Sequence, residues 1–113
     1  MFKRLFGMKG EDIAVKYLKK KGYEIVERNF HTRYGEIDII IRKGGVLIFV
    51  EVKRRSSKSF GTASAAVTST KQKKIIKSAE YYCMMEKIQS LCRFDVIAID
   101  GEELTHIENA FQR

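Results

Sequence analysis

Apolar positions recur along the chain with two different periods, which separate helical segments from extended ones. Residues 8 to 21 place apolar side chains on adjacent helical turns and stop before Gly22, a residue that favours helix termination. Residues 71 to 89 repeat this pattern, with Thr68 or Thr70 available as a cap. The spacing therefore predicts two helices, one at the start of the chain and one past its middle.

Strand-forming residues fill most of the remaining sequence. Two strand-like runs flank Lys43-Gly44-Gly45, and a Gly-Gly pair is a good hairpin connection. The predicted strands are residues 23–30, 35–42, 46–54, 92–99 and 104–111. The order αβββαββ predicts one α/β domain with a mixed, mainly antiparallel sheet flanked by helices. Residues 54 to 70, rich in small and hydroxyl side chains, are expected to form a long connection.

A loop made of Gly44-Gly45 fixes the register of the central hairpin. Lys43 then pairs with Val46, and each further pair has residue numbers that sum to 89. A slip by one residue would move every side chain to the other face, so the apolar pattern supports this pairing. It predicts one apolar face shared by Ile37, Ile39, Ile41, Ile48, Val50 and Val52.

The same register brings charged side chains together. Asp38 is predicted to face Glu51, and Glu36 to face Lys53. Two opposed carboxylates repel each other, and a divalent cation between them removes that repulsion. Mg²⁺, or Mn²⁺ in its place, needs only one or two carboxylates beside water and phosphate, so both acids are candidate metal ligands. Lys53 would then hold a water or a phosphate, which is the chemistry of phosphodiester hydrolysis.

Each acid also has an ordinary structural interpretation. The alternation around Asp38 is typical of any half-exposed strand, and only the partners Glu51 and Lys53 raise it to a catalytic candidate. Glu36 can simply pair with Lys53 or Arg54 in solvent.

Composition narrows the choice of partner. The chain of 113 residues holds 22 Lys and Arg against 14 Asp and Glu, a formal net charge of +8. Such a field attracts polyanions, of which nucleic acid is the commonest. No stretch approaches a membrane span or a secretory leader, so we expect no membrane partner and a cytoplasmic location. Cys83 and Cys92 lack paired ligand spacing, which favours reduced thiols over a zinc site or a disulfide.

Asp38, followed on the next strand by Glu51-Val52-Lys53, resembles the PD-(D/E)xK nuclease superfamily. The longer runs GEDIAVKYL, GYEIVERNF, GEIDIII, VLIFVEVKRR, AVTSTKQKKI and CRFDVIAI are similar to the YraN-like family of small bacterial proteins, across nearly the whole chain. That family resembles Holliday-junction-resolvase nucleases, which implies a restriction-endonuclease-like fold. By this resemblance Glu11, on the first helix, joins Asp38 and Glu51 as a metal ligand and catalytic group. An acid there is also favoured by the helix dipole alone.

Basic side chains near these acids form the predicted nucleic-acid-binding rim. In related nucleases a Gln or Lys on the second helix approaches the site, so the resemblance adds Lys71 and Gln72. The complete rim is Arg33, Arg54, Arg55, Lys58, Lys71, Gln72 and Lys74. A charge run of this kind is also typical of a solvated helix face. The neighbouring Tyr81, Tyr82, Met84 and Met85 are assigned to the core or to a dimer interface rather than to base stacking.

Three functions remain open at this point. The leading prediction is a Mg²⁺-dependent endonuclease that acts on DNA, including branched DNA. The alternatives are a non-catalytic nucleic-acid-binding module and an accessory module that recruits a partner through the Tyr- and Met-rich helix. An enzyme needs Asp38, Glu51 and Lys53 together, whereas a binder needs mainly the basic rim. The choice between DNA and RNA, and that between a monomer and a homodimer, stay open.

Overall fold

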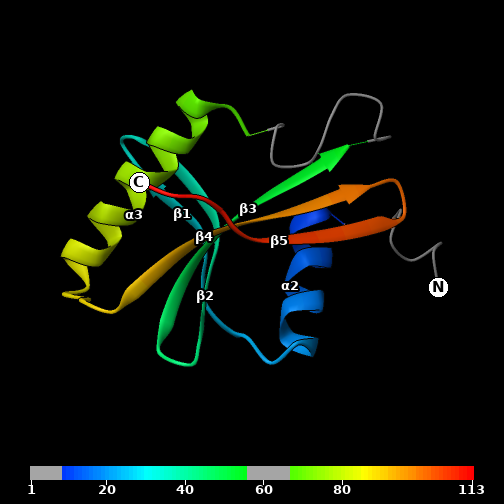
Figure 1. Ribbon diagram of the computed structural model, residues 1–113, viewed down its shortest axis with the longest axis horizontal. Coiled ribbons are helices and arrows are strands. Elements are labelled where there is room, and N and C mark those ends of the chain that lie inside the picture. Colours follow the sequence, from blue (N-terminus) through cyan, green and yellow to red (C-terminus); the bar gives the residue numbers. More distant parts are fainter. Residues whose placement is uncertain (1–8, 56–66) are drawn as a thin grey trace.

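A five-stranded sheet organises the part of the chain that the structure, a computed structural model, describes, residues 9–55 and 67–113. The elements are α2 (Gly10–Lys20), β1 (Glu24–Thr32), β2 (Gly35–Lys43), β3 (Val46–Arg55), α3 (Ser69–Met85), β4 (Leu91–Asp100) and β5 (Glu103–Phe111) (Figure 1). This order confirms the predicted αβββαββ arrangement. Most of the predicted long connection falls on residues 56–66, outside the described residues.

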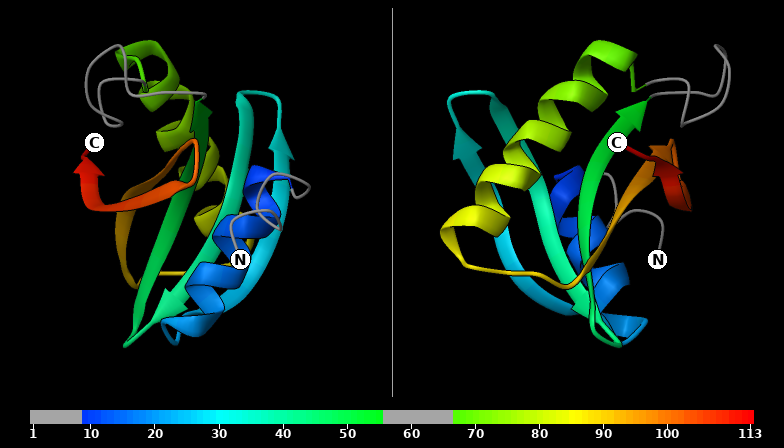
Figure 2. Two further views of the ribbon diagram at one scale, coloured as in Figure 1. Left: turned by 90° about the vertical axis from the view of Figure 1, so that its right-hand side faces the viewer. Right: turned by 60° about the vertical axis from the view of Figure 1, so that its left-hand side comes forward.

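The strands follow one another across the sheet in the order β1-β2-β3-β4-β5. Only β3 and β4 run parallel, and the other neighbours are antiparallel, as expected for a mixed sheet. Strand β3 therefore lies in the centre, which explains why its run Val46–Val50 is apolar at every position. Both views of Figure 2 show α2 and α3 on opposite faces of the sheet.

Each helix covers its own hydrophobic core. On the α3 side, helix residues such as Ile75 and Tyr82 pack against Phe49 of the sheet. On the α2 side, Leu18 packs with sheet residues that include Ile48. Alternate residues of β3 enter the two cores, so the central strand is buried from both faces.

The register of the central hairpin agrees with the sequence prediction over its regular part, from Lys43–Val46 to Ile39–Val50. The prediction is wrong for Ile37, which packs in the α3-side core, whereas Ile39 lies in the α2-side core.

The backbone next to Asp38 explains this departure. Strand β1 pairs Arg28 with Ile39 and Phe30 with Ile37. Between them, Asn29 has φ 52°, a left-handed conformation that a regular strand does not contain. The side-chain alternation is therefore broken at the position where β2 carries its acid.

Helix α3 begins with a side-chain cap, as predicted. The Thr68 hydroxyl accepts a hydrogen bond from the backbone N–H of Lys71 at 3.1 Å. Neither described helix has the length and apolar content that crossing a bilayer would require.

A buried polar network joins β4 and β5 to α2. The Asp95 carboxylate is fully buried and accepts hydrogen bonds from Arg93 at 2.8 and 2.9 Å and from the backbone N–H of Asn109 at 3.0 Å. It also lies 2.7 Å from Nε2 of His106, whose Nδ1 is 3.1 Å from the Tyr17 hydroxyl. These contacts satisfy a charge that would otherwise be costly inside the protein.

Candidate carboxylate site

Asp38 lies where the regular pairing of β2 with β3 ends. Its Oδ2 accepts a hydrogen bond from the backbone N–H of Val52 at 2.8 Å, one position beyond the residue predicted to face it. Burial and the charge of Glu51 raise the pKa of Asp38 to about 7, against the lowering effect of the Val52 hydrogen bond. Asp38 is therefore partly protonated near neutral pH.

Glu51 is the more enclosed acid of this pair, with 7% of its side chain exposed. Its Oε2 lies 3.1 Å from Nζ of Lys71, in the first turns of α3. The hydrogen bond and the charge of Glu51 raise the pKa of Lys71, which keeps the ammonium charged. Lys71, which the sequence placed only in the outer rim, is thus the direct partner of a candidate metal ligand.

Glu11 approaches the same region from α2. Burial, followed by the charge of Asp38, raises the pKa of Glu11, while Arg28 lowers it from 3.6 Å away. Among the described residues, its Oε1 is the one buried side-chain oxygen or nitrogen that lacks a hydrogen-bond partner. A buried acceptor without a hydrogen-bond partner has room for a further ligand, such as a cation or a water.

The acids act on one another although they come from three elements. Glu51 and Glu36 raise the pKa of Asp38, and Asp38 and Glu36 raise that of Glu11. In the described ranges, no three Asp, Glu, His or Cys side chains are arranged to hold a metal ion by themselves. The chemistry of the donor set still fits Mg²⁺, since this ion commonly binds through one or two carboxylates and keeps several waters.

Lys53 follows Glu51 by two positions on β3 and is exposed to solvent. Within the described part of the chain the Lys53 side chain makes no hydrogen bond or ion pair, so its ammonium is available to an incoming anion. The predicted pairing of Glu36 with Lys53 is not found. Oε1 of Glu36 lies instead 3.3 Å from Nε2 of His31 on β1.

The residues of the predicted basic rim differ in their surroundings. Arg54 is exposed and lies beside the start of α2, where a Cβ on Gly10 would be 3.5 Å from its own Cβ. Arg55 is instead paired with the buried Asp100 at 2.6 Å, so its charge serves the fold. Lys58 lies outside the described residues.

The other rim residues lie along α3 and the β1–β2 turn. Gln72 donates from Nε2 to the carbonyl of Val67 at 2.9 Å and helps to close the start of α3. Lys74 is exposed, and a Cβ on Gly35 would lie 3.7 Å from its Cβ. Arg33 is exposed on the β1–β2 turn, which Lys74 approaches at Gly35.

Sequence reasoning missed Arg28 as a neighbour of the site. Its Nη2 lies 2.6 Å from Oδ1 of Asp12 and 3.6 Å from Oε1 of Glu11, so it links β1 to the first turn of α2. Arg28 lies opposite Ile39, the residue that follows Asp38 on β2. This position depends on the β1–β2 register, which the sequence pattern did not provide.

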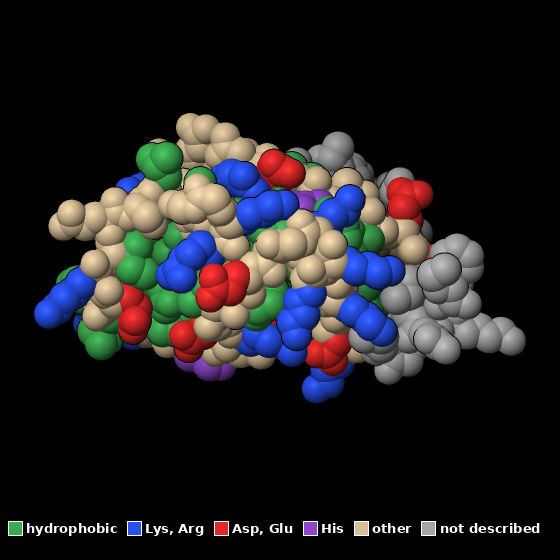
Figure 3. All heavy atoms as spheres, turned by 90° about the horizontal axis from the view of Figure 1, so that it is seen from below, with side chains coloured by type: hydrophobic (Ala, Val, Ile, Leu, Met, Phe, Trp, Pro, Cys, Tyr) green, Lys and Arg blue, Asp and Glu red, His purple; other side chains and the backbone are tan. Residues whose placement is uncertain are grey.

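Net charge alone does not mark a binding surface. On the face drawn in Figure 3, Lys and Arg side chains are spread among acidic and apolar ones and form no continuous patch. On this face the overall charge of +8 does not mark a binding surface, so we define the candidate interface by the local contacts of the carboxylates.

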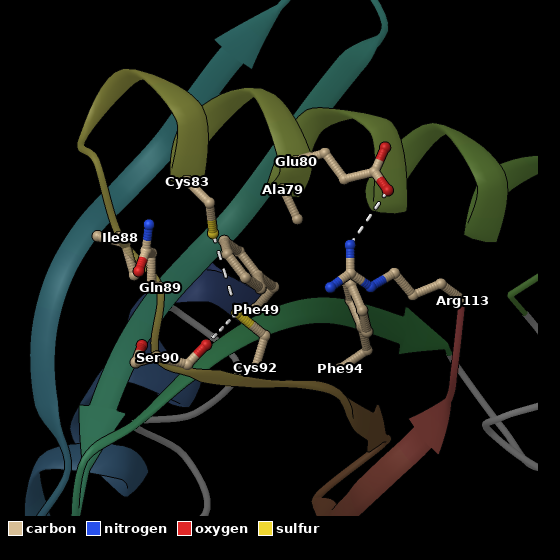
Figure 4. A pocket seen from close by; sticks show the side chains of 10 residues that line it. All are labelled: Phe49, Ala79, Glu80, Cys83, Ile88, Gln89, Ser90, Cys92, Phe94 and Arg113. Carbon is tan, nitrogen blue, oxygen red and sulfur yellow. Dashed lines mark hydrogen bonds and ion pairs between the residues drawn. The ribbon is translucent and has the colours of Figure 1, made fainter.

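A separate cavity lies between the end of α3 and β4. Its volume is about 190 Å³, and its lining includes both cysteines, whose sulfur atoms are 3.8 Å apart (Figure 4). An ion pair of Arg113 with Glu80, at 3.2 Å, lies at its side. None of the carboxylates discussed above lines it, so it is not part of the carboxylate site.

Cys83 is expected to alkylate slowly in the folded protein. Burial and the neighbouring Cys92 raise the pKa of Cys83 to about 11, so little reactive thiolate forms. At about pH 8, iodoacetamide should modify Cys83 at least about tenfold more slowly in the native protein than in the urea-unfolded chain. Peptide mass spectrometry measures both rates, and equal rates would contradict the burial of this thiol.

The fold and the site define a mixed α/β protein with a carboxylate cluster at the end of its central strand. The chain belongs to the uncharacterised protein family UPF0102, whose family model matches residues 10–99. This membership confirms the resemblance to the YraN-like family, whereas the resemblance to nucleases rests on the motif alone.

Relatives match over almost the whole chain. A UPF0102 protein of Thermodesulfovibrio yellowstonii is 50% identical over 105 residues, covering 93% of this chain and 94% of its own. A second, from Herminiimonas arsenicoxydans, is 44% identical over 110 residues, covering 97% and 89%. A third, from Persephonella marina, is 43% identical over 112 residues, covering 98% and 97%.

Proposed function

We propose that this protein is a divalent-metal-dependent nuclease that hydrolyses phosphodiester bonds in DNA. The observation that carries the proposal is the group of acids Glu11, Asp38 and Glu51, in which burial and neighbouring negative charge raise the pKa of Asp38 and of Glu11. Stability alone does not favour such an arrangement, because like charges repel more strongly away from water. Perturbed acids of this kind cluster at functional sites.

The side chains present suit a divalent cation and a phosphate together. Asp38 and Glu51 would bind Mg²⁺ or Mn²⁺ directly, and Glu11, whose Oε1 lacks a hydrogen-bond partner, would complete the site through a bound water. When bound, such a cation supplies Lewis-acid stabilisation of negative charge on the phosphate.

The lysines supply the remaining functions. Lys53, exposed at the end of β3, would bind a phosphate oxygen and stabilise the charge that grows there as water attacks phosphorus. The Lys71 ammonium, 3.1 Å from Oε2 of Glu51, holds that buried carboxylate in position. Attack by water forms one P–O bond and breaks another; the attacking water loses one proton to solvent, and the departing oxygen takes up one proton from solvent.

A second candidate is a nucleic-acid-binding module that does not cleave. The ion pair of Lys71 with Glu51 favours it, since a lysine can compensate a buried carboxylate without any metal. In such a module the acids are structural, and affinity comes from Lys53, Arg54 and Lys74.

The test is cleavage of labelled linear, flapped and four-way-junction DNA with Mg²⁺ or Mn²⁺. Asp38→Asn and Lys53→Ala should each lower the cleavage rate by about 100-fold or more, the usual cost of losing a group that stabilises the transition state. Binding of the same DNA, measured in EDTA by fluorescence anisotropy, should change only a few-fold in Lys53→Ala.

Matched controls are Glu102→Gln, at the β4–β5 turn, and Lys20→Ala, at the opposite end of α2 from Glu11, and both residues are exposed. Each should leave cleavage unchanged. If the native chain binds DNA but cleaves none of these substrates with either metal, the binding module replaces the nuclease.

A further inference from the structure

An open groove runs between the β1–β2 turn and the outer face of α3. Its volume is about 720 Å³, and it is lined by His31, Thr32, Arg33, Tyr34, Tyr81 and Met84. A smaller hollow of about 270 Å³ shares Tyr34, Tyr81 and Met84 with it and is also lined by Lys77 and by Glu80, whose carboxylate is paired with Arg113 at 3.2 Å. The two hollows together form what we name the tyrosine groove.

Aromatic and basic side chains are combined in the tyrosine groove. The Arg33 guanidinium lies 5.0 Å from the centre of the Tyr34 ring, and the Lys77 ammonium lies 5.5 Å from it. Tyr81 and Met84 remain exposed, Met84 to 65%. Exposed aromatic rings beside cations are the combination that binds single-stranded nucleic acid, with the bases on the rings and the phosphates on the cations.

The turn that carries Tyr34 is held in place. The Thr32 hydroxyl accepts hydrogen bonds from the backbone N–H groups of Tyr34 and Gly35, at 3.0 and 3.2 Å. It also lies 2.8 Å from the hydroxyl of Ser78, which is fully buried on α3. The backbone that carries the Tyr34 ring is thus fixed relative to α3, which lowers the entropy lost when a ligand binds.

Helix α3 connects the groove to the carboxylate site. Lys71 contacts Glu51 in the first turns, Lys74 approaches Gly35, and Tyr81 follows further along the helix. Lys71 and Tyr81 are ten residues apart in the chain, which is roughly 15 Å along a helix. That length corresponds to about four stacked nucleotides at 3.4 Å each.

We propose that the tyrosine groove binds an unpaired nucleotide of the substrate, whose base stacks on Tyr34 and Tyr81. The inference rests on the proposed function and narrows its substrate to DNA with a single-stranded segment, such as a flap or an opened branch. The positions of Arg33, Lys74 and Lys77 favour this occupant over a second copy of the chain. A two-fold interface would bring the same cations of both copies together.

The test uses binding in EDTA, so that cleavage is not required. A labelled flapped duplex, a blunt duplex and a flapped duplex with an abasic flap are titrated by fluorescence anisotropy. The double variant Tyr34→Ala with Tyr81→Ala should weaken flap binding by about 5-fold to 100-fold, the range expected for lost base stacking. Blunt-duplex and abasic-flap binding should change less than about twofold, because the phosphate contacts remain.

Two further variants separate stacking from folding. Tyr34→Phe with Tyr81→Phe keeps both rings and should retain flap binding, and Met85→Ala, exposed on α3 outside the groove, should behave like the native chain. Circular dichroism verifies that each variant is folded. An equal loss on all three DNAs, or no loss on the flap, overturns the proposal.

The outcome is independent of the nuclease assay. If flap binding depends on the tyrosines but no DNA is cleaved, the groove proposal stands and the nuclease proposal is rejected. If the flap is cleaved and the tyrosine variants leave both binding and cleavage unchanged, the nuclease proposal stands and the groove proposal is rejected. Sedimentation of the native chain and the double variant completes the test. A dimer that becomes a monomer on losing the two rings would make the groove a self-interface and overturn the proposal.

Discussion

Asp95→Ala is expected to lower the free energy of unfolding by about 3 to 5 kcal/mol, the usual cost of removing one partner from a buried charge network. The substitution leaves the Arg93 guanidinium and the buried His106 ring without the carboxylate that both contact. It also frees the backbone N–H of Asn109. Urea denaturation followed by circular dichroism measures the loss.

The stabilisation by Asp95 should also appear in the pH dependence of the free energy of unfolding of the native protein. Burial alone would raise the pKa of Asp95, but hydrogen bonds from His106, Arg93 and Asn109 outweigh it and hold the pKa below its ordinary value. Because the folded pKa is depressed, this stabilisation is complete above the ordinary carboxyl pKa and is lost as the pH falls through the folded pKa. Asp95→Asn should flatten that acidic limb.

The matched control for this loss is Glu108→Ala. Glu108 contacts the same Arg93, at 3.6 Å, but its side chain is 60% exposed. A surface pair of this kind contributes no more than about 1 kcal/mol, so the control should remain close to the native stability. Similar losses in the two variants would show that Asp95 contributes no more than a surface acid.

Asp38→Asn is expected to stabilise the metal-free protein while it removes cleavage. Burial and the charge of Glu51 hold the pKa of Asp38 at about 7, so ionisation of Asp38 costs folding energy at neutral pH. An asparagine has no such charge, and its carbonyl oxygen can still accept the hydrogen bond from Val52. The expected gain at about pH 8 in EDTA is roughly 2 to 4 kcal/mol.

The pH dependence of the free energy of unfolding distinguishes the loss of the Asp38 charge from a general stabilisation by the substitution. A raised acid pKa means that the folded state holds the proton, so the native stability falls as the pH rises from about 4 to about 7. The gain in Asp38→Asn should therefore be small near pH 4 and complete above pH 7. Glu102→Gln serves as the control, and an Asp38→Asn variant less stable than the native chain at every pH would refute the argument.

A divalent cation should stabilise the native chain more than it stabilises Asp38→Asn. Ligands that bind only the folded state stabilise it, so Mg²⁺ should raise the melting temperature of the native chain more than that of Asp38→Asn. This measurement needs no DNA and therefore reports on the acids alone.

Local patterns were sufficient to predict the elements, the hairpin register and the central place of β3. Gly44-Gly45 allows one tight connection, and the apolar run of β3 is compatible only with burial on both faces. The face of Ile37 could not be predicted, because it depends on the left-handed conformation of Asn29 in the neighbouring strand. Asparagine only permits that conformation, and the tertiary structure selects it.

The site was predicted where its residues share a hairpin and missed where they come from distant segments. Asp38 and Glu51 follow from one register, whereas the contact of Lys71 with Glu51 depends on how α3 crosses the sheet. The same is true of Asp95 and His106, which appear in the sequence as isolated polar residues in two strands.

The parallel pairing of β3 with β4 has a consequence for synthesis of the chain. All the candidate acids lie before Arg55, yet β3 obtains its second neighbour only when residues from Leu91 onward have been made. Until then an apolar strand has an unpaired edge, the kind of surface to which other chains add strands. The nascent chain is therefore most exposed to aggregation while the ribosome is translating α3, and co-translational protection matters most over that interval.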